Sequence, residues 1–263
     1  MKGNLNKPIE KLTKSDIENI KLICFDCDGV TVEKGTEVIE NKSESIIRTK
    51  EIRPEMVEKA VELGKYFHVS FSSGRSMLYL KRMYENVLGA NVSLQAEIGM
   101  FCLYEGKLRQ NFELSGYELE VIRNVRLELA NLKDERIEGF EPKIFLTTLH
   151  CKEAVSEVDE IVKKNDPRDE FYCWWNEEAY DIGPKRINKG TGLEKLTGKL
   201  GIKMVEVMTV GNGINDENMT EVTGIDVSTD PKNLKADFAV FGEHLAGEKV
   251  VDKLLQLRIK DNV

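Results

Sequence analysis

The sequence predicts an α/β fold in which a doubly wound, Rossmann-like parallel sheet is interrupted by an inserted α+β domain. Two observations favour this fold. Toward both ends of the chain, short and continuously apolar segments alternate with helical patterns, which is typical of parallel strands covered by helices on both faces. Between these regions the order becomes helix, two strands, helix, two strands, which indicates a small antiparallel sheet with helices on one face.

The expected domain boundaries follow from these patterns. Residues 1–20 form a polar N-terminal leader, residues 21–110 and 185–263 form the core, and residues 111–184 form the insert. The patterns break near Glu105-Gly106 and Gly183-Pro184, where glycine and proline favour turns. We therefore expect hinges at these two places, about which the insert moves as a lid.

The first part of the core is predicted as alternating strands and helices. Lys21–Phe25 ends abruptly at Asp26, as expected for a short buried strand. Pro54 marks a helix start, because proline fits the first helical turn. In chain order, the expected elements are a strand over Lys21–Phe25, a helix over Pro54–Phe67, a strand over Phe67–Phe71, a helix over 76–87 and a strand over Val92–Ala96.

The insert and the second part of the core are assigned from the same kinds of pattern. In the insert we expect helices over Tyr117–Leu132 and Lys152–Lys164, and strands over Arg136–Phe140, Lys143–His150, Glu170–Trp175 and Ala179–Ile182. In the second part of the core we expect helices over Thr191–Leu200 and Glu248–Leu257, and strands over Met204–Val210, Ile225–Val227 and Phe238–Phe241.

Composition excludes several classes of protein. Among 263 residues, 46 are acidic and 38 are basic, which gives a formal net charge of −8. An acidic surface repels a phosphate backbone, so we expect no nucleic-acid partner. The sequence has no apolar stretch long enough to cross a bilayer, and its first 20 residues lack the apolar segment of a signal peptide. We therefore expect a cytoplasmic protein without a membrane partner, and the sequence does not indicate its oligomeric state.

The five cysteines favour reduced thiols over a disulfide framework, because their number is odd and they are scattered along the chain. Cys24 and Cys27 form a C-x-x-C pattern. In the predicted strand, however, residues three apart point to opposite faces, so the two sulfurs cannot share one metal ion. We interpret both as small buried apolar residues.

Polar side chains gather where the predicted core strands end. In open α/β sheets, ligands bind beyond the carboxyl ends of the strands, so these side chains are expected to converge on one rim. Their carboxylate, amide and hydroxyl oxygens suit Mg²⁺, and a lysine adds positive charge. The residues are Asp26 and Asp28 after the first strand, Ser72, Ser73, Gly74 and Arg75 after the second, Lys189 at a helix start, and Asn212, Asn215 and Asp216 after the fourth.

Such a rim suits phosphoryl transfer. A carboxylate can accept the phosphoryl group and so divide one difficult displacement into two easier steps. A second carboxylate can protonate the leaving oxygen and later deprotonate water. A dinucleotide-binding loop is the alternative for Gly211 and Gly213, but the third glycine position of that fingerprint is Asp216.

Four segments in this order resemble the motifs of the haloacid dehalogenase superfamily of phosphatases. Asp26–Val30 is similar to the first motif, D-x-D-G-[TV], and Ser73–Arg75 to the second, Thr or Ser before Gly-Arg. Asn188–Gly190 resembles the third motif, and Gly211–Asp216 resembles the fourth, usually G-D-x-x-N-D. The resemblance implies a Mg²⁺-dependent phosphatase that acts through an aspartyl-phosphate.

The resemblance also assigns a role to each residue of the rim. Asp26 would be the nucleophile, Asp28 the general acid and base, and Lys189 the residue that stabilises the phospho-aspartate. Ser73, Gly74, Arg75 and Asn215 would bind the substrate. The metal ligands would be Asp26, Asp28, Asn212 and Asp216. Position 212 departs from the family, which normally has a metal-binding aspartate there; asparagine can still offer a carbonyl oxygen, but the site loses one negative charge.

The insert lies between the second and third motifs, where the family carries its type II cap. Its order of elements resembles the smaller IIB-like variant of sugar-phosphate and phosphoglycolate phosphatases, so we expect a small phosphorylated metabolite of this kind as substrate. Trp174 and Trp175 point to opposite faces of a strand, so at most one faces the ligand, and we interpret His150 as structural. Two alternatives remain: a phosphomutase of the same superfamily, and a non-catalytic phosphometabolite-binding protein weakened at its metal site by Asn212.

Overall fold

The computed structural model describes residues 6–40, 43–242 and 245–259. The chain divides into two compact units. The first, which we call the core unit, comprises residues 1–34, 51–111 and 188–263. The second, which we call the insert unit, comprises residues 35–50 and 112–187. The predicted α/β class is confirmed.

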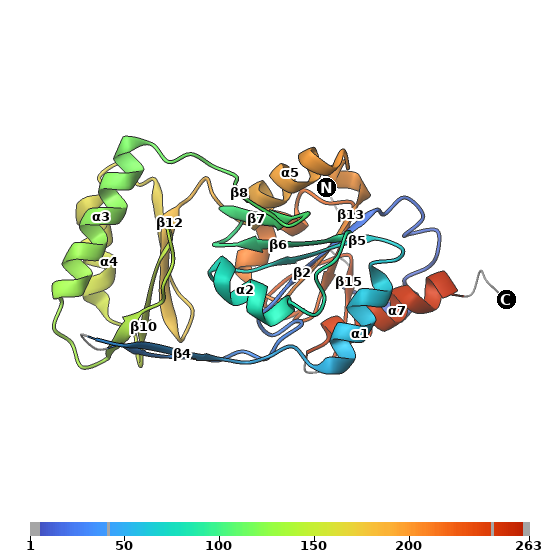
Figure 1. Ribbon diagram of the computed structural model, residues 1–263, viewed down its shortest axis with the longest axis horizontal. Coiled ribbons are helices and arrows are strands. Elements are labelled where there is room, and N and C mark those ends of the chain that lie inside the picture. The colour runs from blue at the N-terminus through green and yellow to red at the C-terminus, as the bar shows by residue number, and fades with distance from the viewer. Residues whose placement is uncertain (1–5, 41–42, 243–244, 260–263) are drawn as a thin grey trace. The chain divides into compact units, whose positions relative to one another are not determined.

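The core unit is built on a mixed sheet, shown in Figure 1. Its strands are β1 (Lys7–Pro8), β2 (Leu22–Asp26), β5 (His68–Ser72), β6 (Val92–Ala96), β7 (Phe101–Tyr104), β8 (Lys107–Gln110), β13 (Val207–Gly211), β14 (Ile225–Ser228) and β15 (Phe238–Ala239). Their order in the sheet is β1-β15-β14-β13-β2-β5-β6-β7-β8. Neighbours from β1 to β6 are parallel, whereas β7 and β8 are antiparallel.

Helices cover both faces of this sheet, as the doubly wound prediction requires. The helices are α1 (Pro54–Leu63), α2 (Met77–Tyr84), α5 (Lys189–Leu200), the short α6 (Glu217–Thr220) and α7 (Gly247–Ile259). Helix α1 packs on α7, and α5 packs on α6. Figure 1 shows α5 on the opposite side of the sheet from α1 and α7. The two central strands, β2 and β13, are therefore buried along their whole length.

The order of the strands creates one switch point in the sheet. From β2 the chain continues to β5 and β6 on one side, and β13, β14 and β15 follow on the other side. Strands β2 and β13 are adjacent and parallel, so their carboxyl ends lie side by side. Connections leave these two ends in opposite directions, and a crevice for ligands is expected between them.

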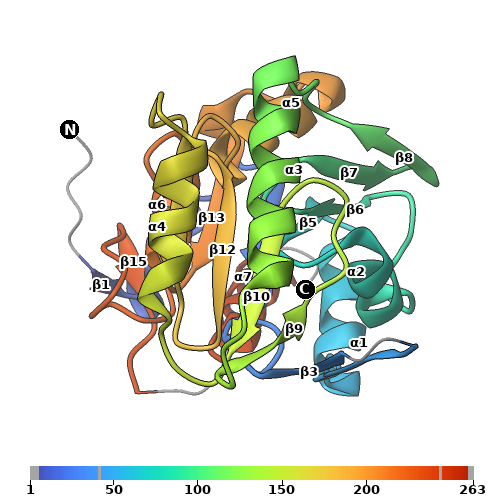
Figure 2. The same cartoon turned by 90° about the vertical axis from the view of Figure 1, so that its left-hand side faces the viewer.

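The insert unit contains a four-stranded antiparallel sheet with the order β11-β12-β10-β9. Its strands are β9 (Ile137–Phe140), β10 (Thr147–Cys151), β11 (Phe171–Trp175) and β12 (Ala179–Pro184). Helices α3 (Gly116–Asn131) and α4 (Ser156–Asn165) pack together on one face of it (Figure 2). The predicted arrangement of two helices on one side of a small sheet is thus present.

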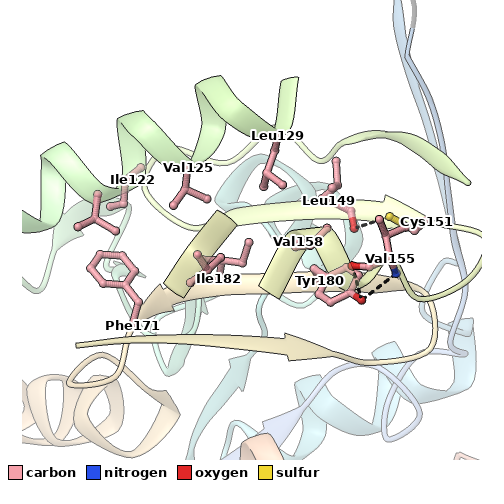
Figure 3. Close-up of a cluster of buried hydrophobic side chains, with 12 residues drawn as sticks. Ile122, Val125, Leu129, Leu149, Cys151, Val155, Val158, Phe171, Tyr180 and Ile182 are labelled. Carbon is pink, nitrogen blue, oxygen red and sulfur yellow. Dashed lines mark hydrogen bonds between the residues drawn. The ribbon is translucent and has the colours of Figure 1, made fainter. Parts of the chain in front are cut away.

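The apolar faces of these elements form the core of the insert unit (Figure 3). Helix α3 begins with a capping box: the Ser115 hydroxyl accepts a hydrogen bond from the Glu118 amide, and the Glu118 carboxylate accepts one from the Ser115 amide. Trp175 lies on the helix side of the sheet and packs against Tyr180, with ring centroids 4.9 Å apart. The buried residues of this core are Val121, Ile122, Val125, Leu129, Leu149, Cys151, Val155, Val158, Val162, Phe171, Tyr180 and Ile182.

One hairpin differs from the expected division of the chain. Strands β3 (Thr36–Glu40) and β4 (Ser45–Thr49) pair with each other, and β3 packs against β9. Residues 35–50 therefore group with the insert unit, although the sequence placed them in the core. The physical reason lies in the burial of Val38, which is 2% exposed within a segment otherwise rich in polar residues. The apolar residues of the two strands come as two adjacent pairs, Val38-Ile39 and Ile46-Ile47, which lack the alternation that marks a half-buried strand.

Two other expectations need correction. The N-terminal leader is part of the core unit, because β1 pairs with β15 and Ile9, Leu12 and Ile17 are buried. The hinge expected near Glu105-Gly106 is instead the tight turn of the β7–β8 hairpin, where both residues have left-handed backbone angles (φ 50° and 67°). The chain passes between the two units after residues 34, 50, 111 and 187, and Gly183 and Pro184 end strand β12 within the insert unit.

The cysteines agree with the sequence prediction: all five are free thiols, and four of them are buried. No helix in the described part of the chain is long and apolar enough to span a membrane.

Candidate active site

The carboxyl ends of β2 and β13 bring most of the predicted site residues together. Asp26 is the last residue of β2, and the loop after β13 carries Asn212 and Asp216. Lys189 is the first residue of α5, where the Asn188 side chain caps the helix by accepting a hydrogen bond from the Thr191 amide. The cap fixes the first turn and with it the starting point of the Lys189 side chain.

Lys189 joins two carboxylates at the bottom of the site. Its Nζ donates hydrogen bonds to Oδ1 of Asp26 at 2.5 Å and to Oδ1 of Asp216 at 2.6 Å. The lysine side chain is fully buried, and Asp26 is 4% exposed. Helix α5 packs closely on α6 because residue 190 is glycine, where a Cβ would lie 2.2 Å from the carbonyl oxygen of Asn218.

Burial and the neighbouring charges shift the pKa values of Asp26 and Lys189. Burial and the neighbouring charge of Asp216 raise the pKa of Asp26 to about 7, although Lys189 opposes the shift. Burial alone would lower the pKa of Lys189, but the carboxylates of Asp216 and Asp26 outweigh it and raise that pKa. One ammonium thus serves two buried carboxylates, and the site as a whole favours a further positive charge.

Asp28 lies on the more open side of the site and is held by Arg75. The Nε of Arg75 lies 3.1 and 3.0 Å from the two carboxylate oxygens, and its Nη2 lies 2.5 Å from Oδ1. The hydroxyl of Ser73 is 3.4 Å from Oδ2 of Asp28 and accepts a hydrogen bond from the Arg75 amide. Gly74 belongs to the same turn. This segment therefore orients one carboxylate while offering a hydroxyl, amides and a guanidinium to an anion.

The loop after β13 is organised by Asp216. Its Oδ2 accepts hydrogen bonds from the backbone amides of Asn212 at 2.8 Å and Gly213 at 3.1 Å. Because its Oδ1 binds Lys189, both oxygens of Asp216 are engaged within the protein. The geometry thus gives Asp216 a role in holding Lys189 and this loop, and leaves its expected role as a metal ligand without support.

Asn212 reaches from this loop to the loop after β2. Its Nδ2 donates a hydrogen bond to the backbone carbonyl of Asp28 at 2.8 Å. Gly29 makes this approach possible, since its φ of 77° suits glycine and a Cβ there would lie 2.5 Å from Nδ2. Asn215 is half-buried in the same loop, and no hydrogen bond joins its side chain to the other predicted site residues that the structure describes.

The residues suit Mg²⁺ by donor type. Among the described residues there is no preformed group of three or more His, Cys, Asp or Glu side chains that could hold a metal ion. Asp26, however, binds Lys189 through Oδ1 and retains a second oxygen, and the Asp28 carbonyl and the Asn212 amide adjoin each other. A carboxylate, a carbonyl and an amide oxygen are ligands that Mg²⁺ accepts together with water.

Two residues that the sequence analysis did not select support the loop after β2. Thr31 Oγ1 donates a hydrogen bond to the carbonyl of Asp26 at 3.2 Å, and it lies 2.7 Å from the hydroxyl of Tyr84. Tyr84 is fully buried in α2 and stacks on Phe71, with ring centroids 4.1 Å apart. The position of Thr31, directly after the first motif, was the available signal; Tyr84 gave none, because an aromatic residue on a helix is typical of a core.

A cavity of about 700 Å³ opens beside the site within the core unit. Gly29 and Asn212 form the part of its wall that it shares with the site. Lys34, Lys232 and the half-exposed Phe241 also line it. Space for a small ligand therefore adjoins the carboxylates.

The fold and the site together define an α/β enzyme core with a buried aspartate paired to a lysine at the switch point of the sheet. The family model of haloacid dehalogenase-like hydrolases matches residues 14–232, and the chain belongs to this family. The family indicated by the four sequence motifs is thus confirmed.

Solved structures resemble the chain over nearly its whole length. Trehalose-6-phosphate phosphatase of Aspergillus fumigatus is 16% identical, with a TM-score of 0.60 over 97% of this chain and 99% of that chain. The C-terminal domain of the C. albicans trehalose-6-phosphate phosphatase is 16% identical, with a TM-score of 0.65 over 94% and 96%. A phosphatase of this superfamily from Bacteroides thetaiotaomicron is 14% identical, with a TM-score of 0.64 over 91% and 96%. At such identities the likeness establishes a shared fold.

Proposed function

We propose that this hydrolase is a Mg²⁺-dependent phosphatase that releases phosphate from a small phosphorylated metabolite through an aspartyl-phosphate on Asp26. The observation that carries the proposal is the buried contact between Lys189 and Asp26 at the end of β2. The ammonium of Lys189 orients the Asp26 carboxylate and offsets its charge, which holds this side chain in place for attack on phosphorus.

The first step follows from the positions of the two aspartates. An oxygen of Asp26 attacks the phosphorus atom, and the bond from phosphorus to the leaving oxygen breaks. Asp28, two residues further on, donates a proton to that oxygen. Ser73 and the amides near Gly74 hold the phosphate oxygens, while Lys189 offsets the charge that develops near Asp26.

The second step reverses the proton transfer. Asp28 takes a proton from a water molecule, which attacks phosphorus and breaks the bond to Asp26. Phosphate leaves, and Asp26 returns to its contact with Lys189. Mg²⁺ bound by Asp26, the Asp28 carbonyl and Asn212 would offset the repulsion between the carboxylate and the phosphate.

For the substrate we propose a sugar phosphate, with phosphoglycolate as the smaller alternative. Two of the similar structures are trehalose-6-phosphate phosphatases, which supports a sugar. In the insert unit, the sheet face opposite α3 and α4 carries Trp174 together with Thr148 and Asp181, which are hydrogen-bonded to each other. Aromatic and carboxylate side chains suit a hydroxylated ring. We propose that the insert unit acts as a cap and selects the substrate.

One observation favours a second candidate, a non-catalytic phosphometabolite-binding protein. Asn212 points its amide nitrogen, rather than an oxygen, at the Asp28 carbonyl. A site that binds metal too weakly would still bind a phosphate through Ser73 and Arg75. Turnover of any phosphate ester excludes this candidate.

The test is phosphate release from a panel of phosphorylated sugars and acids, with no bisphosphate activator present. We expect turnover of at least one sugar phosphate by the unchanged protein, and none by Asp26→Asn. Asp169→Asn is the matched control, since Asp169 lies on the surface of the insert unit with its carboxylate 89% exposed. Release that depends on an added bisphosphate would instead indicate a phosphomutase.

A further inference from the structure

The hydrogen bond between Asn212 and Asp28 joins two loops that are 184 residues apart in sequence. One loop directly follows Asp26 at the end of β2 and carries Asp28, and the other follows β13 and carries Asp216. The donor is the side-chain Nδ2 of Asn212, and the acceptor is the backbone carbonyl of Asp28, at 2.8 Å. The two loops are thus tied together at the mouth of the site by groups of this chain alone.

The direction of this hydrogen bond is fixed by its acceptor. A backbone carbonyl can only accept, so the amide of Asn212 must present its nitrogen. The backbone of Asn212 is held at the same time, because its N–H donates to Oδ2 of Asp216. Nδ2 lies 2.5 Å from the point that a Cβ on Gly29 would occupy, and only glycine leaves room for it.

A carboxylate at position 212 would behave differently. Two oxygens would then face each other, one from the side chain and one from the Asp28 carbonyl, near the charges of Asp26 and Asp216. Such a site holds together only when a cation lies between the oxygens. The asparagine needs no cation. Lys34 adds positive charge beside Gly29, since its Cε lies 2.8 Å from the position that a Cβ on residue 29 would occupy.

We propose that Asn212 takes the place of a cation as the link between the two loops, so that the site is assembled before any metal binds. Metal would then serve turnover and contribute little to the stability of the site. The statement about turnover rests on the function proposed above, whereas the statement about assembly does not. In the metal-free protein, Asn212 therefore acts as a positioning residue for the loop that carries Asp28.

The experiment compares local hydrogen exchange in three proteins: the unchanged chain, Asn212→Ala and Asn212→Asp. Each is measured in EDTA and again with Mg²⁺. The reporter is the segment over 26–32, and the buried strand β6 (Val92–Ala96) of the same unit serves as an internal control for unfolding of the core unit. A variant that fails to fold reveals itself by loss of protection in the control segment, and Asn212→Ser, which removes less volume, then replaces it.

We expect the unchanged protein to protect residues 26–32 equally with and without Mg²⁺. In EDTA both variants should exchange there about fivefold to tenfold faster, because one hydrogen bond is lost. Mg²⁺ should restore protection in Asn212→Asp, which offers the ion a carboxylate, and should not restore it in Asn212→Ala. A merely structural role would make the two variants respond alike.

Two results separate the failure of this inference from the failure of the proposed function. If Asn212→Ala protects residues 26–32 in EDTA as well as the unchanged protein does, the link does not exist and the inference is overturned. If both variants lose protection in EDTA and Mg²⁺ restores neither, the hydrogen-bonded link between the loops stands, while its equivalence to a cation and the proposed Mg²⁺ site are both overturned.

Discussion

The ammonium of Lys189 lies between Oδ1 of Asp26 and Oδ1 of Asp216, and solvent reaches none of the three side chains to a significant extent. Burying a charge is costly unless an opposite charge compensates it. Here one lysine compensates two carboxylates, so its removal leaves both of them buried near each other. Lys189 therefore contributes to the stability of the folded protein as well as to the proposed reaction.

We predict that Lys189→Met lowers the free energy of unfolding by about 3–5 kcal/mol, the usual range for breaking one side of a buried ion pair. Urea unfolding at neutral pH measures this change in the free energy of unfolding. Lys107→Met, on the exposed edge strand β8, is the control and should change stability little. Equal stability of the two variants would mean that Asp26 and Asp216 are not charged together in the folded protein.

Gly29 should be irreplaceable for a reason specific to the site. Gly29→Ala adds a Cβ at a φ of 77° and 2.5 Å from Asn212 Nδ2. Gly106→Ala has the same kind of backbone strain, with φ of 67°, but no atom within 4 Å of the new Cβ. We expect Gly29→Ala to abolish phosphate release and Gly106→Ala to retain it. Similar activities would show that a Cβ at position 29 does not disturb the site.

Tyr84 supports the loop after β2 through its contact with Thr31, and it does not touch the reacting atoms. Tyr84→Phe removes the hydroxyl 2.7 Å from Thr31 Oγ1 and keeps the ring that stacks on Phe71. We expect kcat to fall several-fold with KM nearly unchanged, and stability to fall by about 1 kcal/mol. Steady-state kinetics with one phosphate ester measures both kcat and KM and so tests this expectation. A change in KM alone would place Tyr84 in substrate binding instead.

His68 should make stability depend on pH. Burial lowers the pKa of His68 to about 4, from its ordinary value near 6.5. As pH falls through about 6.5 the unfolded chain takes up a proton that the folded protein does not, so stability is full above that pH and declines toward pH 4. From about pH 7.5 to about pH 5 the loss should be about 2 kcal/mol.

The matched variant is His68→Gln, whose amide does not titrate and can bond to the Ser93 hydroxyl as His68 does. Urea midpoints at both pH values, compared between the two proteins, isolate the contribution of the histidine. An unchanged pH dependence in His68→Gln would show that other groups cause it.

The sequence predicts the site residues best where a polar side chain stands at the end of a predicted strand or at the start of a predicted helix. Asp26 could be placed because it ends a continuously apolar strand, and Lys189 because a helix start follows Asn188. The hairpin of β3 and β4 could not be found, since its apolar residues form two adjacent pairs, Val38-Ile39 and Ile46-Ile47, rather than the alternation of a half-buried strand. The direction of the Asn212 amide could not be predicted either, because an amide offers a donor and an acceptor of equal size.

The most direct test of the account is to trap the phosphoryl group on Asp26. In Asp28→Asn the loss of the base should slow hydrolysis of the aspartyl-phosphate, whereas nitrophenyl phosphate needs little help from an acid to form it. We predict a burst of one nitrophenolate per protein, with the added phosphoryl mass on the peptide that contains Asp26 after an acid quench. The double variant Asp26→Asn/Asp28→Asn should show neither. A phosphoryl group on another residue, or a burst that survives in the double variant, would contradict the account.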